Sequence, residues 1–254
     1  MRVTFLGTGT SGGVPVINCH CAVCTSENPK NKRLRSSVMI TIDKTFLLID
    51  TTPDLRQQML RKPFPRIDAI LYTHAHADHV FGLDEIRRFN YLMKKRIPAY
   101  GNASTMERLI KVFDYAFAAP DVAIQKGIPN LSAHVVNGPF DVSGIRVTPI
   151  PLLHGEQTIL GYRIGNFAYC TDVNRIPESS YALLQGLDVL VLDALREKRH
   201  PSHFSLGEAV TEARKIGARR TYFTHFSHIL DHERHGSMLP GQMAFAYDGL
   251  ELEL

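Results

Sequence analysis

The sequence predicts an α/β (α+β) fold in which two mixed sheets are flanked by helices. Two observations support this prediction. Short runs rich in β-branched and aliphatic residues open each half of the chain, at residues 2–6 and 145–152. Segments with apolar residues at helical spacing follow these runs in both halves. We therefore expect two sheets with helices outside them, in one domain that spans residues 1–254.

The first half is predicted to contain four strands and two helices. The strands are expected at residues 2–6, 38–42, 45–49 and 70–72. From Val80 to Met93 the apolar residues follow helical spacing, which predicts one helix that ends at the basic run 94–96. Ser104 and Glu107 have the spacing of a capping box and predict the start of a second helix, with apolar residues continuing to Phe117.

The second half repeats the order of strands first. Strands are expected at residues 145–152, 159–164 and 167–170, followed by a helix over 177–185 and a strand over 188–192. Ser205 and Glu208 predict a capping box, and Gly217 is expected to end the helix that it starts. The remaining strands are expected at residues 221–223, 243–247 and 250–254.

Composition narrows the class of protein. With 44% hydrophobic and 21% charged residues among 254, the chain has the balance of a globular protein rather than a disordered or fibrous one. Apolar runs fall short of the ~18 residues of a membrane span, and the N-terminus lacks the apolar core of a signal peptide, so a cytoplasmic location without membrane contact is expected. A net charge of +4, spread evenly, argues against nucleic acid as a partner and is compatible with a small anionic ligand.

The segment after the predicted strand 70–72 predicts metal chemistry. It contains four potential ligands within six positions, namely His74, His76, Asp78 and His79. A regular helix would turn residues two positions apart about 200° away from each other, so these side chains need an irregular loop to converge. Imidazole and carboxylate together suit Zn²⁺, Mn²⁺ or Fe²⁺. A loop of solvated histidines is the alternative, and the density of the pattern argues against it.

Three further candidates follow predicted strands, at the points where loops leave the sheet: His154, Asp172 and His225. The ordered set of HxHxDH, then His, Asp and His, resembles the metallo-β-lactamase fold superfamily over essentially the whole chain. The resemblance implies a four-layer αββα sandwich with a dinuclear site at one edge of the sheets. It also implies the ligands: His74, His76 and His154 for one metal, Asp78, His79 and His225 for the other, and Asp172 as the bridge.

Such a site has a preferred substrate charge. Two divalent cations, two carboxylates and a bridging hydroxide would leave a net charge of about +1, which attracts an anion. A metal-bound water can lose its proton near pH 7 and attack as the nucleophile. Taken alone, such a site is compatible with hydrolysis of a phosphodiester, a lactone, a thioester or an amide.

A second cluster of ligands lies near the N-terminus. Cys19, Cys21 and Cys24 supply three thiolates within six positions, in a loop at about 18–30, and a closed structural Zn²⁺ site needs a fourth ligand. His228 is the candidate, because it lies three residues beyond His225. Reduced, buried thiols without metal are the alternative.

Four motifs together resemble a narrower family: residues 7–15, the CxCxxC cluster, the segment 73–79 and the segment 224–228. They are similar to the phosphoribosyl cyclic phosphodiesterases of the carbon-phosphorus lyase pathway, which implies a role in phosphonate metabolism. The resemblance implies two Mn²⁺ or Zn²⁺ ions, one structural Zn²⁺, and opening of 5-phosphoribosyl 1,2-cyclic phosphate to ribose 1,5-bisphosphate. It gives catalytic roles to Asp78 and to His203, which would contact phosphate or protonate the leaving oxygen.

Two aspartates are candidates for a supporting role. Asp50 and Asp248 could each accept the outer N–H of a ligand histidine or simply fix a turn, and Asp50 is favoured as functional.

Rival functions remain open from sequence. A lactonase, a thioesterase, a β-lactamase or a cyclic-nucleotide phosphodiesterase would use the same ligands, whereas a tRNA 3′-processing nuclease would need a basic arm that the chain lacks. From another class, a zinc-stabilised binding protein resembling the pyrroloquinoline-quinone biosynthesis protein would lack the full catalytic ligand set. The choice between Mn²⁺ and Zn²⁺ and the oligomeric state, a homodimer included, also stay open.

Overall fold

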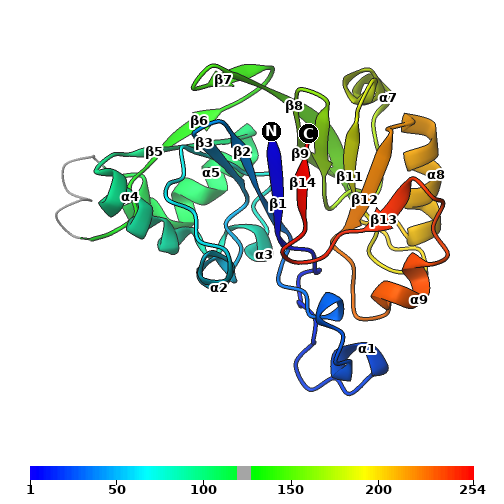
Figure 1. Cartoon of the computed structure of the whole chain (residues 1–254). Coiled ribbons are helices and arrows are strands. Elements are labelled where there is room, and N and C mark those ends of the chain that lie inside the picture. The colour runs from blue at the N-terminus through cyan, green and yellow to red at the C-terminus, as the bar shows by residue number, and fades with distance from the viewer. Residues whose placement is uncertain (119–126) are drawn as a thin grey trace.

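The computed structural model describes residues 1–118 and 127–254 and contains two seven-stranded sheets packed face to face, with helices on the outside of each (Figure 1). The predicted fold class is confirmed. The first sheet has the order β14 (Glu251–Glu253), β1 (Arg2–Gly7), β2 (Ser37–Ile42), β3 (Thr45–Ile49), β4 (Ala69–Leu71), β5 (Ile97–Gly101), β6 (Leu131–Val135). The second sheet has the order β13 (Met243–Phe245), β12 (Arg220–Thr224), β11 (Val189–Asp193), β10 (Phe167–Cys170), β9 (Gln157–Ile164), β8 (Ile145–His154), β7 (Phe140–Val142).

Each sheet is antiparallel on one side and parallel on the other. Strands β3, β4, β5 and β6 run parallel, and so do β10, β11, β12 and β13. Parallel neighbours bring their carboxyl ends to the same edge of a sheet. The loops that follow β3, β4, β10, β11 and β12 are therefore gathered along one edge of the sandwich.

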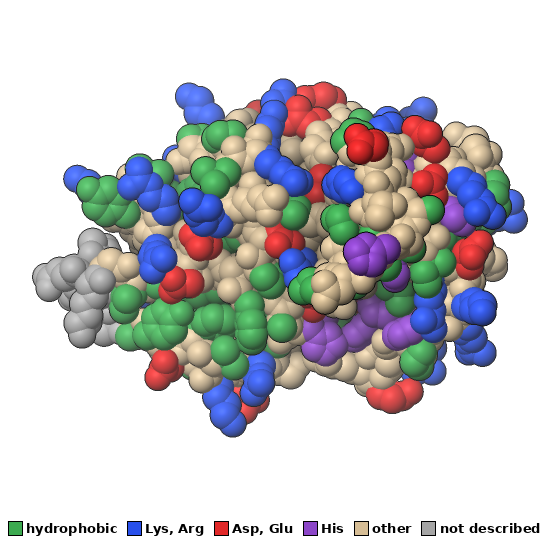
Figure 2. Space-filling model, turned by 90° about the horizontal axis from the view of Figure 1, so that it is seen from below, with side chains coloured by type: hydrophobic (Ala, Val, Ile, Leu, Met, Phe, Trp, Pro, Cys, Tyr) green, Lys and Arg blue, Asp and Glu red, His purple; other side chains and the backbone are tan. Residues whose placement is uncertain are grey.

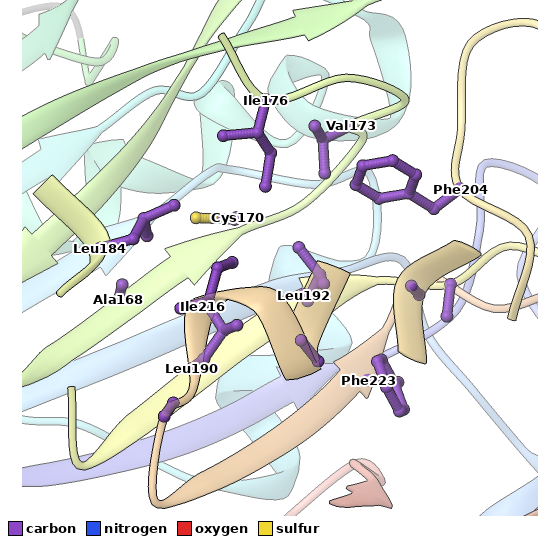
Figure 3. Packing of buried hydrophobic residues seen from close by; sticks show 14 of the residues in the cluster. Ala168, Cys170, Val173, Ile176, Leu184, Leu190, Leu192, Phe204, Ile216 and Phe223 are labelled. Carbon is purple, nitrogen blue, oxygen red and sulfur yellow. The ribbon is translucent and has the colours of Figure 1, made fainter. Parts of the chain in front are cut away.

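Three apolar layers hold the sandwich together. Between the sheets, residues such as Phe5 and Ile40 pack with Tyr169 and Val191 of the other sheet. The helices α2 (Leu55–Arg61), α4 (Arg87–Met93) and α5 (Ala103–Val112) cover the outer face of the first sheet. Figure 3 shows the third layer, where Leu184 and Ile216 lie over Cys170, Leu190 and Leu192 of the second sheet. This layer belongs to α7 (Glu178–Tyr181), the 3₁₀ turn Ala182–Leu184 and α8 (Leu206–Ile216).

Two predictions about helix ends had different outcomes. The capping box of Ser205 and Glu208 at the start of α8 is confirmed, and Gly217 ends the helix in the left-handed conformation with φ 71°. The predicted cap at Ser104 is wrong, because α5 begins at Ala103, two residues earlier than that cap would place it, and the Asn102 side chain accepts the hydrogen bond from the Thr105 amide. Asparagine is as good an N-cap as serine, and here it lies where the strand ends.

The single helix predicted over residues 80–93 is also wrong. The segment contains α3 (Ala77–Val80), a 3₁₀ turn at Leu83–Ile86 and then α4. At the break, the Gly82 amide donates to the Thr51 carbonyl at 2.9 Å, and the Thr51 amide donates to His79. A Cβ atom at Gly82 would lie 1.9 Å from the carbonyl oxygen of Thr52. The helix is therefore interrupted at Gly82, because the backbone there packs closely against residues 51–52.

The loop after β1 joins the two halves of the sandwich. The absence of a side chain at Gly7 and Gly9 lets this loop approach residues 33–35, where a Cβ at Gly7 would lie 2.0 Å from the Arg35 carbonyl. The Phe226 amide then donates to Thr8 at 3.2 Å. This contact places the segment that follows the loop, which contains α1 (Ala22–Thr25), next to the loop after β12.

One short helix, α9 (His232–Gly236), completes the set near β13. In the described part of the chain, helices fall short of the length and apolar character that crossing a membrane requires.

Candidate metal centres

The predicted ligand segment leaves the end of β4 and runs into α3. His74 lies in the irregular loop, His76 occupies the N-cap position of α3, and Asp78 and His79 lie in its first turn. The change from extended loop to helix after His76 turns the two pairs of side chains toward a common region. Small residues at positions 75 and 77 separate the ligands.

The other three predicted residues come from the second sheet. His154 is the last residue of β8, Asp172 follows β10, and His225 follows β12. Asp172 and His225 adopt the left-handed conformation, with φ 57° and φ 59°, and so does Asp50 after β3, with φ 62°. Non-glycine residues in this region carry about 1–3 kcal/mol of strain each and persist where surrounding contacts hold them. The strained residues therefore mark the edge at which the strand ends converge.

The structure brings all seven side chains together in two neighbouring groups. Ligand atoms of the first group lie within 4.8 Å of one another, and so do those of the second. The first group is His74, His76 and His154, and the second is Asp78, His79, Asp172 and His225. These are the two sets that the superfamily resemblance implies.

Asp172 lies between the two groups. Its Oδ2 is 3.2 Å from His79 Nε2, and its Oδ1 is 3.2 Å from His225 Nε2. The same Oδ1 is 4.0 Å from His74 Nε2, and Asp172 also forms a further group of possible ligands with His154 and His203. This carboxylate can therefore contact a cation in either group.

Burial and charge compete strongly in this cluster. Burial alone would raise the pKa of Asp172, but the neighbouring His225 and His79 hold it well below its ordinary value. Burial would lower the pKa of His79, yet Asp172, Asp78 and Asp50 raise it well above its ordinary value. The carboxylates thus create a strongly negative site in a dry environment, which favours a positive charge whether proton or metal ion.

Unsatisfied polar atoms indicate that a cation fits. Nε2 of His79 and Nε2 of His225 are buried and make no hydrogen bond of acceptable geometry with the described residues, although oxygens of Asp172 lie 3.2 Å from each. Buried polar atoms are nearly always paired, so each such atom requires an explanation. Imidazole nitrogens and carboxylates facing one another are the donor set of Zn²⁺ and Mn²⁺ sites.

Outer partners orient several of these rings. Asp50, which is fully buried, lies 2.7 Å from His79 Nδ1 and also accepts from the amide and hydroxyl of Thr73. The Ser202 carbonyl lies 2.8 Å from His154 Nδ1. Such contacts fix the ring tautomer, so that the opposite nitrogen faces the metal. Asp50 therefore lies where the sequence analysis expected a supporting carboxylate.

The supporting role expected of Asp248 is wrong. Its carboxylate accepts from the Thr8 hydroxyl at 2.9 Å and the Leu34 amide at 2.8 Å, and it contacts no candidate ligand histidine. Burial raises its pKa to about 6. Asp248 ties the loop after β1 to residue 34 instead, because β14 lies beside β1, away from the ligand cluster.

Sequence reasoning missed Asp193. Its Oδ2 lies 3.0 Å from His203 Nδ1, and its Oδ1 lies 3.5 Å from His225 Nδ1. One fully buried carboxylate thus contacts both a candidate ligand and the predicted catalytic histidine. The sequence contained a signal for this residue, because Asp193 ends a buried strand in the same way that Asp50 follows one. The predicted strand ended at residue 192, so Asp193 was not considered as a candidate.

His203 lies beside the candidate ligands without belonging to the two main groups. Its ring is 4.7 Å from that of His154 and stacks on that of His225 at 5.0 Å. It also lines a cavity of about 430 Å³ with Asn174, His200 and Arg199. Because Nδ1 of His203 contacts Asp193, Nε2 of His203 is the ring nitrogen that can contact a molecule bound in this cavity.

The cysteine cluster is separate and simpler. The Sγ atoms of Cys19, Cys21 and Cys24 lie 3.3, 3.4 and 3.6 Å from His228 Nδ1. Tetrahedral zinc with ordinary bond lengths would place such atoms about 3.6 Å apart. The cysteines are free rather than disulfide-bonded. The Cys24 amide and nearby groups lower the pKa of Cys21 to about 6, which favours the thiolate that binds metal.

Figure 2 shows the face that carries the candidate site, seen from below the view of Figure 1. Histidine side chains gather in a hollow near the middle of this face. A band of hydrophobic side chains leads toward them from the side of the first sheet, and Lys and Arg side chains lie on the opposite side.

Comparison with known proteins places the chain in a family. Residues 45–226 match the family described as the beta-lactamase superfamily domain. The chain belongs to this superfamily. A solved structure described as a new diphosphatase from the PhnP family has 46% identity and a TM-score of 0.93, with 100% of this chain and 98% of that chain covered. Zinc-bound PqqB from Methylobacterium extorquens, at 24% identity and TM-score 0.80 over 100% of both chains, shares the superfamily's fold.

Two curated relatives have names that do not refer to a phosphatase or phosphodiesterase. Coenzyme PQQ synthesis protein B of Methylobacterium nodulans is 30% identical over 227 residues, covering 76% of this chain and 72% of that protein. An octanoyltransferase of Porphyromonas gingivalis is 36% identical over 256 residues, covering 99% of this chain. The chain spans 51% of the length of that octanoyltransferase.

Proposed function

We propose that this superfamily member is a single-domain, metal-dependent hydrolase of phosphate esters. Two divalent cations, Mn²⁺ or Zn²⁺, would be held by the two histidine and aspartate groups, and one structural Zn²⁺ by the cysteine cluster. The observation that carries the proposal is the position of Asp172, whose two oxygens face both groups at 3.2–4.0 Å. A carboxylate in this position suits a pair of cations rather than one.

Cations bound there would activate a water molecule near neutral pH and neutralise charge on phosphate oxygens. Positioning of the substrate and proton transfer would come from the chain's own residues. Asp172, Asp78 and the histidines place the reacting phosphate next to the cations. His203 faces the same space, with its ring held by Asp193 at 3.0 Å. It can contact a phosphate oxygen or give a proton from Nε2 to the departing alkoxide.

The substrate class follows from charge and similarity. A site with two cations and two carboxylates attracts an anion. The 46% identical structure is described as a diphosphatase, and a diphosphate is also an anionic phosphorus compound. We propose a ribosyl phosphodiester as substrate. The resemblance of the sequence motifs to phosphoribosyl cyclic phosphodiesterases implies 5-phosphoribosyl 1,2-cyclic phosphate, opened to ribose 1,5-bisphosphate in phosphonate metabolism.

A zinc-stabilised binding protein is the second candidate, because relatives named coenzyme PQQ synthesis protein B match this chain. All seven candidate ligands converge in this structure, which favours the hydrolase. The name octanoyltransferase belongs to a protein about twice as long as the match, and no acyl-transfer role is proposed here.

A substrate panel tests the proposal. Protein purified without chelator is assayed on the ribosyl cyclic phosphate, 2′,3′- and 3′,5′-cyclic nucleotides, a lactone, a thioester and a β-lactam, with Asp172→Ala as the matched control. Turnover of phosphodiesters that disappears in the variant supports the proposal. Turnover of only the lactone, thioester or β-lactam would contradict the substrate class, and metal-loaded protein inactive on the whole panel would favour the binding protein.

A further inference from the structure

A second cavity opens beside the candidate metal site, on the side of the first sheet. It has a volume of about 260 Å³ and is bounded by α3 and α5. His76, a candidate ligand whose Nδ1 lies 3.0 Å from His74 Nε2, forms part of its wall. A molecule whose phosphate lies at the metal site can therefore extend into this cavity.

The lining of the cavity is mostly apolar. Val80 and Phe81 contribute from the end of α3, and Leu109, Val112 and Phe113 from the last turns of α5. The rings of Phe81 and Phe113 meet edge to face with centroids 5.9 Å apart. Phe81 is 56% exposed and Val112 is 37% exposed, although both lie next to a site for polar chemistry. The hydrophobic band that approaches the histidines in Figure 2 lies on this side of the molecule.

Arg108 is the charged residue in the lining. It is exposed on α5 and forms no ion pair with any residue that the structure describes. A guanidinium group stacks well on aromatic faces, including nucleobases. An edge-to-face pair of phenylalanines beside a free guanidinium is therefore a better match for a flat ring than for a flexible alkyl chain.

The size of the cavity sets the size of the group. Pockets that enclose a drug-sized ligand have volumes of about 300–1,000 Å³. A cavity of about 260 Å³ is too small for a whole nucleotide and suits one ring system attached to a sugar outside it.

We propose that this cavity binds the base of a nucleoside phosphodiester whose phosphate lies at the metal site. The proposal rests on the proposed function, the hydrolysis of a ribosyl phosphodiester. Within that class it replaces 5-phosphoribosyl 1,2-cyclic phosphate with a nucleoside phosphodiester, because C1 cannot carry both the cyclic phosphate and a base, and a bare ribosyl phosphate would leave the cavity unused. Phe81 and Phe113 contact the ring, the buried Leu109 limits the depth of insertion, Val112 contributes to the wall, and Arg108 covers the ring from the solvent side.

Binding is measured first, so that the result does not depend on catalysis. Isothermal titration calorimetry compares AMP with ribose 5-phosphate on the metal-loaded protein, since the two ligands differ only by the base. The wild type should bind AMP at least about tenfold more tightly, as expected from stacking of one base. Val112→Trp, which fills the cavity, should abolish this advantage. Ile110→Trp is the matched control, because Ile110 is 41% exposed on the same helix and does not line the cavity.

Arg108→Gln gives a second test that does not depend on tolerance of a large residue in α5. It should reduce the advantage of AMP several-fold, and its far-ultraviolet circular dichroism should match the wild type. Hydrolysis then compares adenosine 2′,3′-cyclic phosphate with the 2,3-cyclic phosphate of methyl riboside. The base should raise kcat/KM in the wild type and in Ile110→Trp, and not in Val112→Trp.

Three results would overturn the proposal: equal affinity for AMP and ribose 5-phosphate, the same loss in both tryptophan variants, or tighter binding of octyl phosphate than of AMP. Base-dependent binding without hydrolysis of any phosphate ester would instead support the cavity and contradict the proposed hydrolase.

Discussion

The two candidate metal centres are built in opposite ways. The histidine and aspartate cluster draws its seven side chains from strand ends in both sheets, and most of them are buried. The cysteine cluster takes three ligands from six consecutive positions and one from His228, and most of its ligands are partly exposed. The geometry of the first centre depends on the packing of the two sheets. The second centre joins two loops, and a metal bound there would stabilise their arrangement.

The surroundings of the two centres differ accordingly. Asp50 and Asp193 contact the rings of the first centre on the side away from the other ligands, and three residues there, Asp50, Asp172 and His225, keep the left-handed conformation. Near the cysteines the apolar packing is small, with Val14 and Val23 beside Cys24. Arg33 connects the loops by donating to the Ser227 and Leu230 carbonyls at 3.0 and 2.7 Å. Loss of a ligand should therefore affect chemistry at the first centre and stability at the second.

The sharpest test of this contrast is Asp172→Ala. Removing the carboxylate that faces both groups should reduce kcat/KM by about 10⁴-fold or more, since residues that act as a unit fail together. The sandwich core is untouched, so the circular dichroism spectrum should match that of the wild type. Retention of more than a tenth of the activity, measured on the best phosphodiester of the panel, would contradict the assignment of Asp172 as the bridge.

His203→Ala should leave both cations bound, because His203 lies outside the two main groups. For a ribose leaving group the expected loss is about 10²- to 10⁴-fold, the usual range for a general acid. For a p-nitrophenyl phosphodiester the loss should be smaller, because this leaving group needs little protonation. Parallel assays of both substrates check this, with His200→Ala as the control from the same cavity. Equal losses would indicate phosphate binding instead, and no loss would remove His203 from the reaction.

Asp50→Asn tests the support behind the first centre. An amide cannot hold the His79 ring as a carboxylate does, and changes to such outer partners typically cost 10- to 100-fold in metal affinity or activity. We expect weaker binding of one cation in a competitive titration, and recovery of most activity at high metal concentration. Asp248→Asn serves as the control, because Asp248 is buried but contacts no candidate ligand histidine. Identical titrations of the two variants would refute the role of Asp50.

Cys21→Ser should have the smallest effect on chemistry and a clear effect on stability. The variant should lose about one equivalent of zinc and unfold at a lower temperature, because structural zinc binding contributes directly to folding free energy. The kcat of the molecules that remain folded should stay within about threefold of the wild type, since the histidine and aspartate ligands are intact. Elemental analysis and thermal unfolding check this. Unchanged metal content and stability would remove the structural site, and total loss of kcat in folded protein would erase the contrast between the centres.

Several features could be predicted because the information is local. The segment 73–79 and the cluster 19–24 contain their ligands within a few positions, so spacing alone indicates metal chemistry. The capping box at Ser205 and the stop at Gly217 are also contained within one helix. Strands β5, β6 and β7 were missed. β5 includes a proline and a glycine, β6 has three exposed residues and β7 is three residues long, so none of them shows a clear apolar pattern.

The sequence by itself determined which side chains can bind metal and that they follow strands, because ligand type and local spacing are properties of short segments. Only the tertiary structure decided which distant segments meet. It placed Asp193 rather than Asp248 behind the histidines, since β11 lies inside the second sheet and β14 at the edge of the first. It also formed the cavity between α3 and α5, because the break at Gly82 ends one helix where the other passes. Such contacts depend on the order of strands in each sheet, and no single segment of the chain contains that order.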